Sequence, residues 1–298
     1  MIRVRIPATS ANVGSGFDSL GLAVTMYNHI YIDEHEGIDI RSLDGLALPA
    51  DSSNLVYKTA KYLYDLCGKP FKGLRIEQRS DIPLARGLGS SSACIVGGLL
   101  GANRLMGSPL NQDEIINIAA ALEGHPDNST PALLGGLVTA VLENGKVWYV
   151  KQSIQGDLCF VAIIPDFELK TSVARAALPG EIAHKDGVFN LSRAALMSVS
   201  LYSGNYQNIR VAADDRLHQP YRLKFIKGGQ QVMDACYRLG AYGVYISGAG
   251  STLMAIVDKN RQDFVQHLAG ELRELGLAGW RLEPLSIDND GTLVEADA

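Results

Sequence analysis

The sequence lacks the long apolar segments of membrane and secreted proteins. No apolar run approaches the roughly 20 residues that a membrane-spanning helix needs. The longest run, residues 93–102, is interrupted by three glycines. The N-terminus alternates polar and apolar residues from Met1 to Arg5 and has no apolar core of a signal peptide. We therefore expect a cytoplasmic location and no membrane partner.

Cysteine is scarce, and its four copies lie far apart, at Cys67, Cys94, Cys159 and Cys236. Each lies inside or beside an apolar segment. No Cys-x-x-Cys pair and no Cys/His spacing of a zinc site occurs. The sequence therefore predicts buried, reduced thiols and no zinc site.

Basic residues are fewer than acidic residues. The chain has 27 Lys and Arg residues against 32 Asp and Glu residues, which gives a formal net charge of −5, and no basic blocks. This balance argues against nucleic acid and anionic membranes as main partners. Hydrophobic residues make up 47% and charged residues 20% of the 298 residues, as in ordinary globular proteins. A chain of this length suits about two domains.

The order of the expected elements indicates an α+β protein, because hairpins mix with helices and no sustained βαβα alternation occurs. Asn144-Gly145 between two apolar runs predicts a type I′ hairpin turn. We place a domain boundary near residue 155, with domains over 1–155 and 156–298. Periodicity predicts strands at 3–7, 22–34, 74–77, 137–142, 146–150 and 158–164, a strand–glycine-loop–strand unit at 243–258, two terminal strands, and helices at 54–67, 90–106, 113–123, 189–203, 224–239 and 261–275.

A glycine- and serine-rich loop, PLARGLGSSSA at residues 83–93, joins a strand to a helix. Glycines let backbone N–H groups converge, the helix N-terminus adds about half a positive charge, and hydroxyls can bind phosphate or Mg²⁺. It is not a Walker A motif, because no lysine follows the last glycine, and Ser92 stands where a Gly-x-Gly-x-x-Gly motif has its third glycine. The loop predicts an anion cradle; the plain alternative is a serine N-cap. Gly97, Gly98 and Gly101 indicate a closely packed helix.

Three separated segments together resemble the GHMP small-molecule kinases: residues 7–21 (PATSANVGSGFDSLG), the loop at 83–93, and residues 246–252 (ISGAGST). Their order and spacing extend over nearly the whole chain. Within this superfamily, the first segment and the stretches 123–128 (EGHPDN) and 131–136 (PALLGG) are most similar to homoserine kinases. The resemblance implies an N-terminal domain like ribosomal S5 domain 2 and a ferredoxin-like C-terminal domain. The family tends to dimerise, which suggests a homodimer.

By this resemblance the chain is expected to bind ATP and Mg²⁺ at the glycine–serine loop. Backbone amides from Gly87 to Ser92 would hold the phosphates. Ser91 and Glu123 would share the Mg²⁺ ion, which prefers octahedral oxygen ligands. The residues expected to contact the nucleotide are Asn54, Leu55, Pro83, Leu84, Ala85, Arg86, Gly87, Leu88, Gly89, Ser90, Ser91 and Ser92.

The same resemblance implies L-homoserine as the small-molecule substrate, a zwitterion whose carboxylate and ammonium both need partners. Arginine suits a carboxylate because its planar fork donates two hydrogen bonds. Arg175 and Arg222 match the family's carboxylate-binding arginines, although Gln219 stands where the family usually has an acidic residue. Asp18 is the expected ammonium partner. The expected substrate-binding residues are Asp18, His125, Asn128, Thr171, Arg175 and Arg222, and the expected catalytic residues are Asn12, Asp18, His125, Asn128 and Arg175.

The expected reaction is direct in-line attack of the substrate hydroxyl on the γ-phosphorus, in threonine biosynthesis. Positioning and charge stabilisation supply most of the catalysis of phosphoryl transfer. Asp127 is the nearest candidate for a general base, and we predict that it is not one. Gly248 and Gly250 are expected to shape the site. The alternatives are another GHMP kinase, for mevalonate or a cytidyl-erythritol, a non-catalytic nucleotide-binding module, and a scaffold in which the glycine loops only pack.

Overall fold

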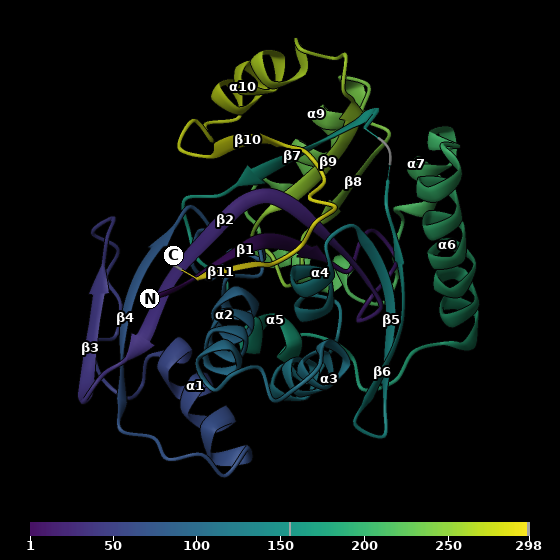
Figure 1. Cartoon of the computed structure of the whole chain (residues 1–298). Helices are drawn as coiled ribbons and strands as arrows, with labels where there is room; N and C mark the ends of the chain where they lie inside the picture. Colours follow the sequence, from purple (N-terminus) through teal and green to yellow (C-terminus); the bar gives the residue numbers. More distant parts are fainter. Residues whose placement is uncertain (155, 297–298) are drawn as a thin grey trace.

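The computed structural model describes residues 1–154 and 156–296, which form two β-sheets with helices packed around them (Figure 1). The strands are β1 (Ile2–Ala11), β2 (Leu20–Glu34), β3 (Gly37–Ser42), β4 (Gly73–Ser80), β5 (Leu137–Glu143), β6 (Lys146–Gln152), β7 (Leu158–Ile164), β8 (Gly243–Ile246), β9 (Leu253–Asp258), β10 (Arg281–Leu285) and β11 (Leu293–Ala296). The helices are α1 (Leu55–Leu66), α2 (Ser90–Leu105), α3 (Gln112–Glu123), α4 (Ser129–Leu134), α5 (Thr171–Ala176), α6 (His184–Ser203), α7 (Ile209–Ala212), α8 (Gln219–Arg222), α9 (Gly229–Arg238) and α10 (Phe264–Glu274), with 3₁₀ helices at Tyr206–Asn208 and Leu223–Phe225.

The first sheet has seven strands in the order β11-β1-β2-β4-β3, with β5 paired to β2 and β6 to β5. β1 and β2 run antiparallel, and their pairing continues along the whole of β1. The strand predicted at 3–7 was therefore too short, because the small residues up to Ala11 also pair with β2 and are buried. Pairing of this length carries the loop that starts at Asn12 to the far end of the sheet.

The second sheet has four antiparallel strands in the order β10-β7-β9-β8. Helices α9 and α10 pack against it through an apolar cluster that includes Val232, Cys236 and Phe264. The predicted strand at 158–164 and the strand–loop–strand unit at 243–258 are confirmed. β11 returns to the first sheet and pairs with β1. The predicted boundary, residue 155, lies outside the described residues.

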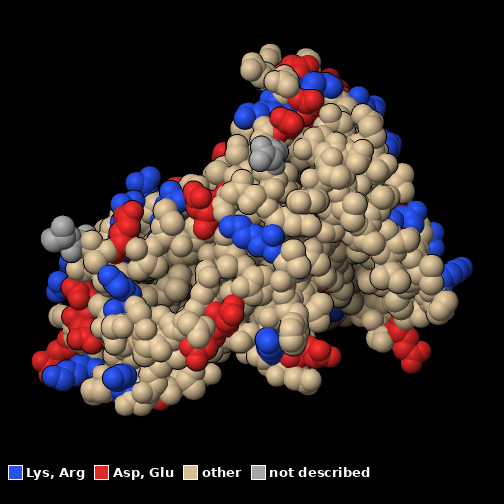
Figure 2. All heavy atoms as spheres, turned by 45° about the vertical axis from the view of Figure 1, so that its right-hand side comes forward, with Lys and Arg blue, Asp and Glu red and all other residues tan. Residues whose placement is uncertain are grey.

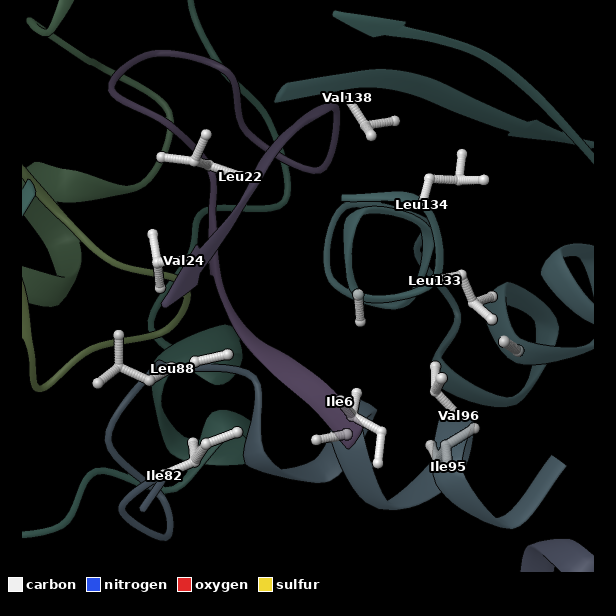
Figure 3. Packing of buried hydrophobic residues seen from close by; sticks show 14 of the residues in the cluster. Ile6, Leu22, Val24, Ile82, Leu88, Ile95, Val96, Leu133, Leu134 and Val138 are labelled. Atoms are coloured by element: carbon white, nitrogen blue, oxygen red, sulfur yellow. The ribbon is translucent and has the colours of Figure 1, made fainter. Parts of the chain in front are cut away.

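Helix α2 packs against β1, β2 and α1, and its close fit depends on glycine. Figure 3 shows Ile6 of β1 beside Val96 of α2. A Cβ added to Gly97 would lie 2.3 Å from Ile30 Cδ1, closer than atoms can pack. The close packing indicated by the glycines is therefore confirmed, and it fixes where the N-terminus of α2 lies.

Most helices and the predicted hairpin are confirmed, with shifts at their ends. Asn144 and Gly145 have φ of 52° and 76°, as a type I′ turn requires. The helix expected at 189–203 begins earlier, at His184, and the helix expected at 224–239 is shorter, as α9. The structure also contains β3 and the short helices α4, α5, α7 and α8, which were not predicted. A helix of four to six residues is too short to show a helical period in the sequence.

The structure also tests the expectations about cysteine, positive charge and membrane-spanning helices. All four cysteines are free thiols, but only Cys236 is buried, so the predicted burial was wrong for the other three, which are half-buried. On the face that Figure 2 shows, the described Lys and Arg residues are interspersed with Asp and Glu and form no extended basic patch. Within residues 1–154 and 156–296, every helix is too short or too polar to span a membrane.

We expect Asn54→Ala to lower the free energy of unfolding by about 1 kcal/mol, because it removes a helix cap. Asn54 is 3% exposed, and its Oδ1 accepts hydrogen bonds from the backbone of Val56 and Tyr57 at the start of α1. The measurement is the midpoint of urea unfolding. The matched control is Asn205→Ala, since the exposed Asn205 makes no capping bond and its loss should leave the midpoint unchanged.

Candidate active site

A cavity of about 300 Å³ lies where segments from both halves of the chain meet. The loop after β1, the N-terminus of α2, the C-terminus of α3, the start of α4, and the helices α5 and α8 all contribute. Its lining consists of Asn12, Ala85, Arg86, Gly87, Gly89, Ser90, Ser91, Ser92, Ile95, Leu122, Glu123, His125, Asp127, Asn128, Thr171, Arg175, Arg222, Gly248 and Ala249.

The N-terminus of α2 opens into this cavity without a side-chain cap. Gly89 is the N-cap residue, with φ of 71°, and no side chain in the described part of the chain caps the first N–H groups of the helix. The serine cap considered as the plain alternative is therefore wrong. Because uncapped N–H groups and the helix dipole favour an anion, this end of α2 suits a phosphate.

The loop before α2 is held in place by the other glycine loop, residues 247–252. Ser247 Oγ donates to Gly87 O at 2.7 Å, and the backbone N–H of Thr252 donates to Arg86 O at 3.2 Å. The Arg86 guanidinium donates to the carbonyls of Leu84, Pro165 and Asp166, so this side chain is engaged in holding the loop. The two glycine loops therefore lie side by side, and Gly248, which was expected to shape the site, lines the cavity, whereas Gly250 does not.

Glu123 ends α3 and points a buried carboxylate toward the start of α2. Ser92 Oγ donates to Glu123 Oε1 at 2.5 Å, whereas Glu123 Oε2 is buried and has no partner among the described residues. Burial raises the pKa of this carboxyl to about 7, against the lowering effect of the Ser92 bond. An unpaired buried carboxylate oxygen is costly unless a cation or donor joins it.

His125 and Asp127 form a tight pair at the side of the cavity. His125 Nδ1 lies 2.6 Å from Asp127 Oδ1, and Asp127 is 1% exposed. Burial lowers the pKa of His125, but the hydrogen bond and charge of Asp127 outweigh it, so the pKa is raised. Asn128 Oδ1 accepts from Thr9 Oγ1 at 2.8 Å, which ties the start of α4 to β1.

Asp18 and Arg175, which lie far apart in the sequence, form a bidentate ion pair. Arg175 Nη2 and Nη1 lie 2.7 and 3.1 Å from the two Asp18 oxygens, and this hydrogen bonding raises the pKa of the guanidinium. Asp18 is held in turn, because its backbone N–H donates to Asn12 Oδ1 at 2.8 Å. Arg175 belongs to α5, so the pair joins the loop after β1 to the second half of the chain.

Arg222 is 1% exposed, although it lines the cavity. Its Nη1 donates to Gly248 O at 2.9 Å. Burial, followed by the positive charge of Arg175, lowers the pKa of Arg222 to about 10, so it is charged at neutral pH. A buried, charged guanidinium is a strong site for a carboxylate.

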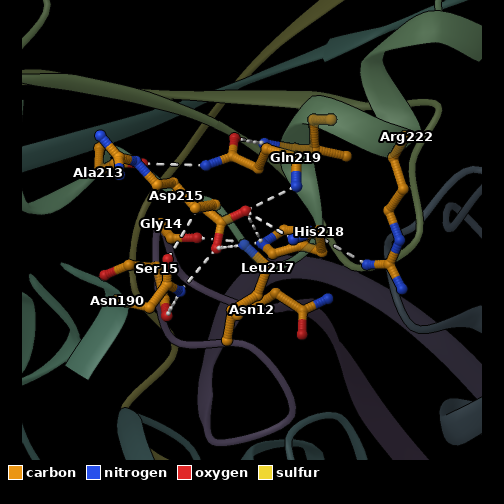
Figure 4. A network of polar contacts seen from close by, with 12 residues as sticks. Asn12, Gly14, Ser15, Asn190, Ala213, Asp215, Leu217, His218, Gln219 and Arg222 are labelled. Carbon is orange, nitrogen blue, oxygen red and sulfur yellow. Dashed lines mark hydrogen bonds and ion pairs between the residues drawn. The ribbon is translucent and has the colours of Figure 1, made fainter. Parts of the chain in front are cut away.

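The short helix α8 that carries Arg222 is fixed by a buried polar network (Figure 4). Asp215 accepts the backbone N–H groups of His218 at 2.8 Å and Gln219 at 2.6 Å, which satisfies free donors at the start of α8. Gln219 donates to Ala213 O and accepts from the Ile246 N–H. An amide performs both roles, whereas an ionised carboxylate at this position could only accept.

Comparison with known proteins identifies the family. The model described as GHMP kinases N terminal domain matches residues 54–136, and the model described as GHMP kinases C terminal matches residues 197–271. A homoserine kinase of Clostridium beijerinckii is 46% identical over 303 residues, which covers 99% of this chain and 99% of the relative. The chain belongs to the homoserine kinase family of GHMP kinases.

Two further homoserine kinases support this membership. That of Caldicellulosiruptor bescii is 46% identical over 297 residues, with 99% of this chain and 97% of the relative covered. The crystal structure of homoserine kinase from Cytophaga hutchinsonii superimposes with a TM-score of 0.87 at 28% identity, over 99% of this chain and 97% of that chain. The resemblance inferred from the three sequence segments and the two-domain GHMP kinase fold are confirmed.

Most of the site residues predicted from the resemblance to this family line the cavity. Asn12, Ala85, Arg86, Gly87, Gly89, Ser90, Ser91, Ser92, Glu123, His125, Asn128, Thr171, Arg175 and Arg222 line it. Asp18 lies beside the lining through its ion pair with Arg175. Asn54, Leu55, Pro83, Leu84 and Leu88 are outside the lining, and the Asn54 side chain is engaged as the cap of α1. Of the two residues expected to share Mg²⁺, Glu123 accepts a hydrogen bond from Ser92, and Ser91 is exposed.

Four lining residues were not among the expected site residues: Ile95, Leu122, Asp127 and Ala249. Asp127 had a sequence signal, because it lies two residues after His125 in the stretch EGHPDN. The other three are apolar, and nothing in their local pattern separates them from core residues.

Proposed function

We propose that this chain transfers the γ-phosphoryl group of ATP to the side-chain hydroxyl of L-homoserine, forming O-phospho-L-homoserine for threonine biosynthesis. One observation carries the proposal: a single cavity joins the uncapped N-terminus of α2 to the charged side chains of Arg175 and Arg222, and Asp18 lies beside it in an ion pair with Arg175. The first feature suits a polyphosphate and the second an amino acid. The full-length similarity to homoserine kinases supports the same activity.

The backbone N–H groups from Gly87 to Ser92 would hold the ATP phosphates. Both Gly87 and Gly89 line the cavity, and their positive φ, which glycine adopts readily, allows the loop to turn there. The residues proposed to contact the nucleotide are those of the loop, Pro83 to Ser92, and, on the family resemblance, Asn54 and Leu55 near the adenine.

The residues beside the phosphate end fit a Mg²⁺ ion. Glu123 supplies a buried carboxylate oxygen that has no partner among the residues described, and Ser91 and Ser92 supply hydroxyls. Together these are the hard oxygen donors that Mg²⁺ prefers. Glu123 with Ser91 is the proposed pair of ligands, and Ser92 would orient the Glu123 carboxylate. When bound, the ion neutralises charge that develops on the phosphates.

The charged groups of the cavity match the two ends of L-homoserine. Arg175 and Arg222 would bind the carboxylate, with Thr171 beside them, and Asp18 would bind the ammonium. A zwitterion can replace both halves of the Asp18–Arg175 pair at once, so that neither side chain is left without an opposite charge. Substrate binding therefore exchanges one ion pair for two.

The reaction would be direct in-line attack of the hydroxyl, held among Asn12, His125 and Asn128. Asp127 is hydrogen-bonded to His125, a contact that supports an orienting role for Asp127 in place of proton abstraction. We also propose, from the sequence and family alone, the two domains 1–155 and 156–298, a homodimer and a cytoplasmic location.

The decisive experiment incubates the chain with Mg²⁺·ATP and L-homoserine and identifies the product by ³¹P NMR and mass spectrometry. We expect O-phospho-L-homoserine and ADP. A parallel panel contains mevalonate and cytidyl-erythritol substrates, which lack the amino-acid ammonium. Phosphorylation of either one without phosphorylation of homoserine would overturn the proposal, as would ATP binding without turnover on any alcohol.

We expect Gly87→Ala to raise the KM for ATP by about tenfold. The added Cβ would lie 2.2 Å from Ser247 O, so the phosphate loop must move away from its present position. Gly145→Ala is the matched control, because Gly145 has a similar φ of 76° but nothing within 4 Å of the added Cβ. It carries the same backbone strain of about 1 kcal/mol without displacing the loop. Equal ATP KM values for the two variants would contradict the assignment of the loop.

A further inference from the structure

His218 is a buried side chain behind the cavity, with no part in the mechanism above. It precedes α8, is 0% exposed and is not among the cavity-lining residues. Its Nδ1 lies 3.3 Å from Arg222 Nη1, and its Nε2 lies 3.2 Å from Gly14 O (Figure 4). A buried imidazole between a guanidinium and a carbonyl can orient the guanidinium.

The two contacts of His218 together define its tautomer. A guanidinium N–H only donates, so Nδ1 must accept from Arg222, and a carbonyl only accepts, so Nε2 must carry the proton toward Gly14. The neutral ring with its proton on Nε2 satisfies both at once. Burial lowers the pKa of His218, in the direction that keeps it neutral, and Asp215 Oδ2, 3.7 Å from Nε2, opposes this shift more weakly.

The hydrogen bonds of Arg222 use one edge of its guanidinium. Nη1 is committed to Gly248 O and to His218 Nδ1. Nε is buried and makes no hydrogen bond within residues 1–154 and 156–296. Because a buried unpaired donor is costly, the free Nε is expected to gain a partner when a ligand occupies the cavity. Because Nη1 is held by these two contacts, the edge of the Arg222 guanidinium that includes Nε remains free to bind the substrate carboxylate.

Phe17 completes the surroundings of Arg222. Its ring is stacked on His218, with centroids 5.3 Å apart and planes 21° apart. The same ring centroid lies 5.2 Å from Arg222 Cζ and 5.8 Å from Arg175 Cζ. An aromatic face attracts cations, so Phe17 can hold two like-charged guanidinium groups near one another before the substrate carboxylate joins them.

We propose that His218 and Phe17 are positioning residues, which hold Arg222 and Arg175 in the orientation that binds the carboxylate of the amino-acid substrate. Neither is proposed to touch the reacting atoms. The proposal rests on the proposed homoserine kinase activity and deepens it, because it identifies what determines the affinity for the carboxylate.

The test compares His218→Gln with His218→Asn in the full chain. Glutamine can replace the Nε2 donor toward Gly14 but offers no acceptor at the Nδ1 position, whereas asparagine can keep an acceptor there. We expect His218→Gln to raise the KM for L-homoserine about tenfold and to leave the KM for ATP unchanged, since one hydrogen bond to a charged group is lost. His218→Asn should restore most of the homoserine affinity. His267→Gln, on the exposed part of α10, is the matched control and should change neither KM.

A substrate without a carboxylate separates positioning from general damage. The kcat/KM for 3-aminopropan-1-ol, which is homoserine without its carboxylate, should be the same in wild type and His218→Gln. A drop as large as that for homoserine, or an unchanged homoserine KM, would overturn the proposal. If His218→Gln does not fold, Phe17→Leu tests the same proposal at a half-buried position. We expect it to raise the KM for homoserine by a smaller factor and to leave the kcat/KM for 3-aminopropan-1-ol unchanged. An unchanged homoserine KM in Phe17→Leu contradicts the proposal. Wild-type activity on homoserine is measured first, so its absence contradicts the proposed function and not the role of His218.

Discussion

Replacing Arg175 with alanine is expected to raise the KM for L-homoserine about 30-fold, while the KM for ATP stays unchanged. Arg175 lines the cavity, and its guanidinium is half-buried, so its loss removes a charge-assisted pair with the substrate carboxylate. Truncating one side of such a pair costs about 2 kcal/mol, which corresponds to the stated change in affinity. The measurement is the initial rate with each substrate varied at saturating levels of the other.

The fold should tolerate this change, because Asp18 is one-third exposed and water can solvate it once its partner is gone. Arg238→Ala is the matched control: this arginine also forms an ion pair, with Glu271 at 2.7 Å, but lies on α9 at the surface. Neither KM should change in the control. If Arg175→Ala raises the KM for ATP as much as the KM for homoserine, Arg175 does not belong to the substrate end of the cavity.

The parts of the fold that sequence reasoning could predict are those with strong local signals. The Asn144-Gly145 turn and the buried strand at 158–164 each have a clear signal within a few residues of sequence. The two predicted terminal strands are present as β10 and β11, but no local signal predicts that β11 pairs with β1. The four residues of β11 are all exposed, and it is a strand because its backbone pairs with β1, almost 290 residues away in the chain.

The site residues that belong to a sequence motif could be predicted. Which of two adjacent residues makes a given contact could not, because that depends on how the helices pack. Successive helical residues point about 100° apart, so Ser91 and Ser92 face different surroundings, and only the position of α3 decides that Ser92 bonds Glu123. The contact of His218 with Phe17 joins residues about 200 positions apart. Its formation depends on the docking of the second half of the chain against the loop after β1, which no local pattern specifies.

Glu123→Gln is expected to lower kcat with Mg²⁺·ATP by at least about 100-fold and to leave the KM for L-homoserine nearly unchanged. Glutamine preserves the shape of the side chain and can still accept the Ser92 hydrogen bond, but it removes the negative charge that a divalent cation needs. The measurement is the rate at increasing Mg²⁺ concentration with ATP fixed. The variant should require far more Mg²⁺ to reach its own maximum.

Loss of folding would not explain such a result. Burial already raises the pKa of Glu123 to about 7, which shows that the site disfavours its charge, so a neutral amide should be at least as well tolerated in the protein interior. The thermal midpoint of Glu123→Gln should therefore equal or exceed that of wild type. Glu143→Gln, at the exposed end of β5, serves as the control and should leave both the midpoint and the Mg²⁺ titration unchanged. If Glu123→Gln shows a wild-type Mg²⁺ titration, the unpaired oxygen of Glu123 has some other partner, and the proposed metal ligand is wrong.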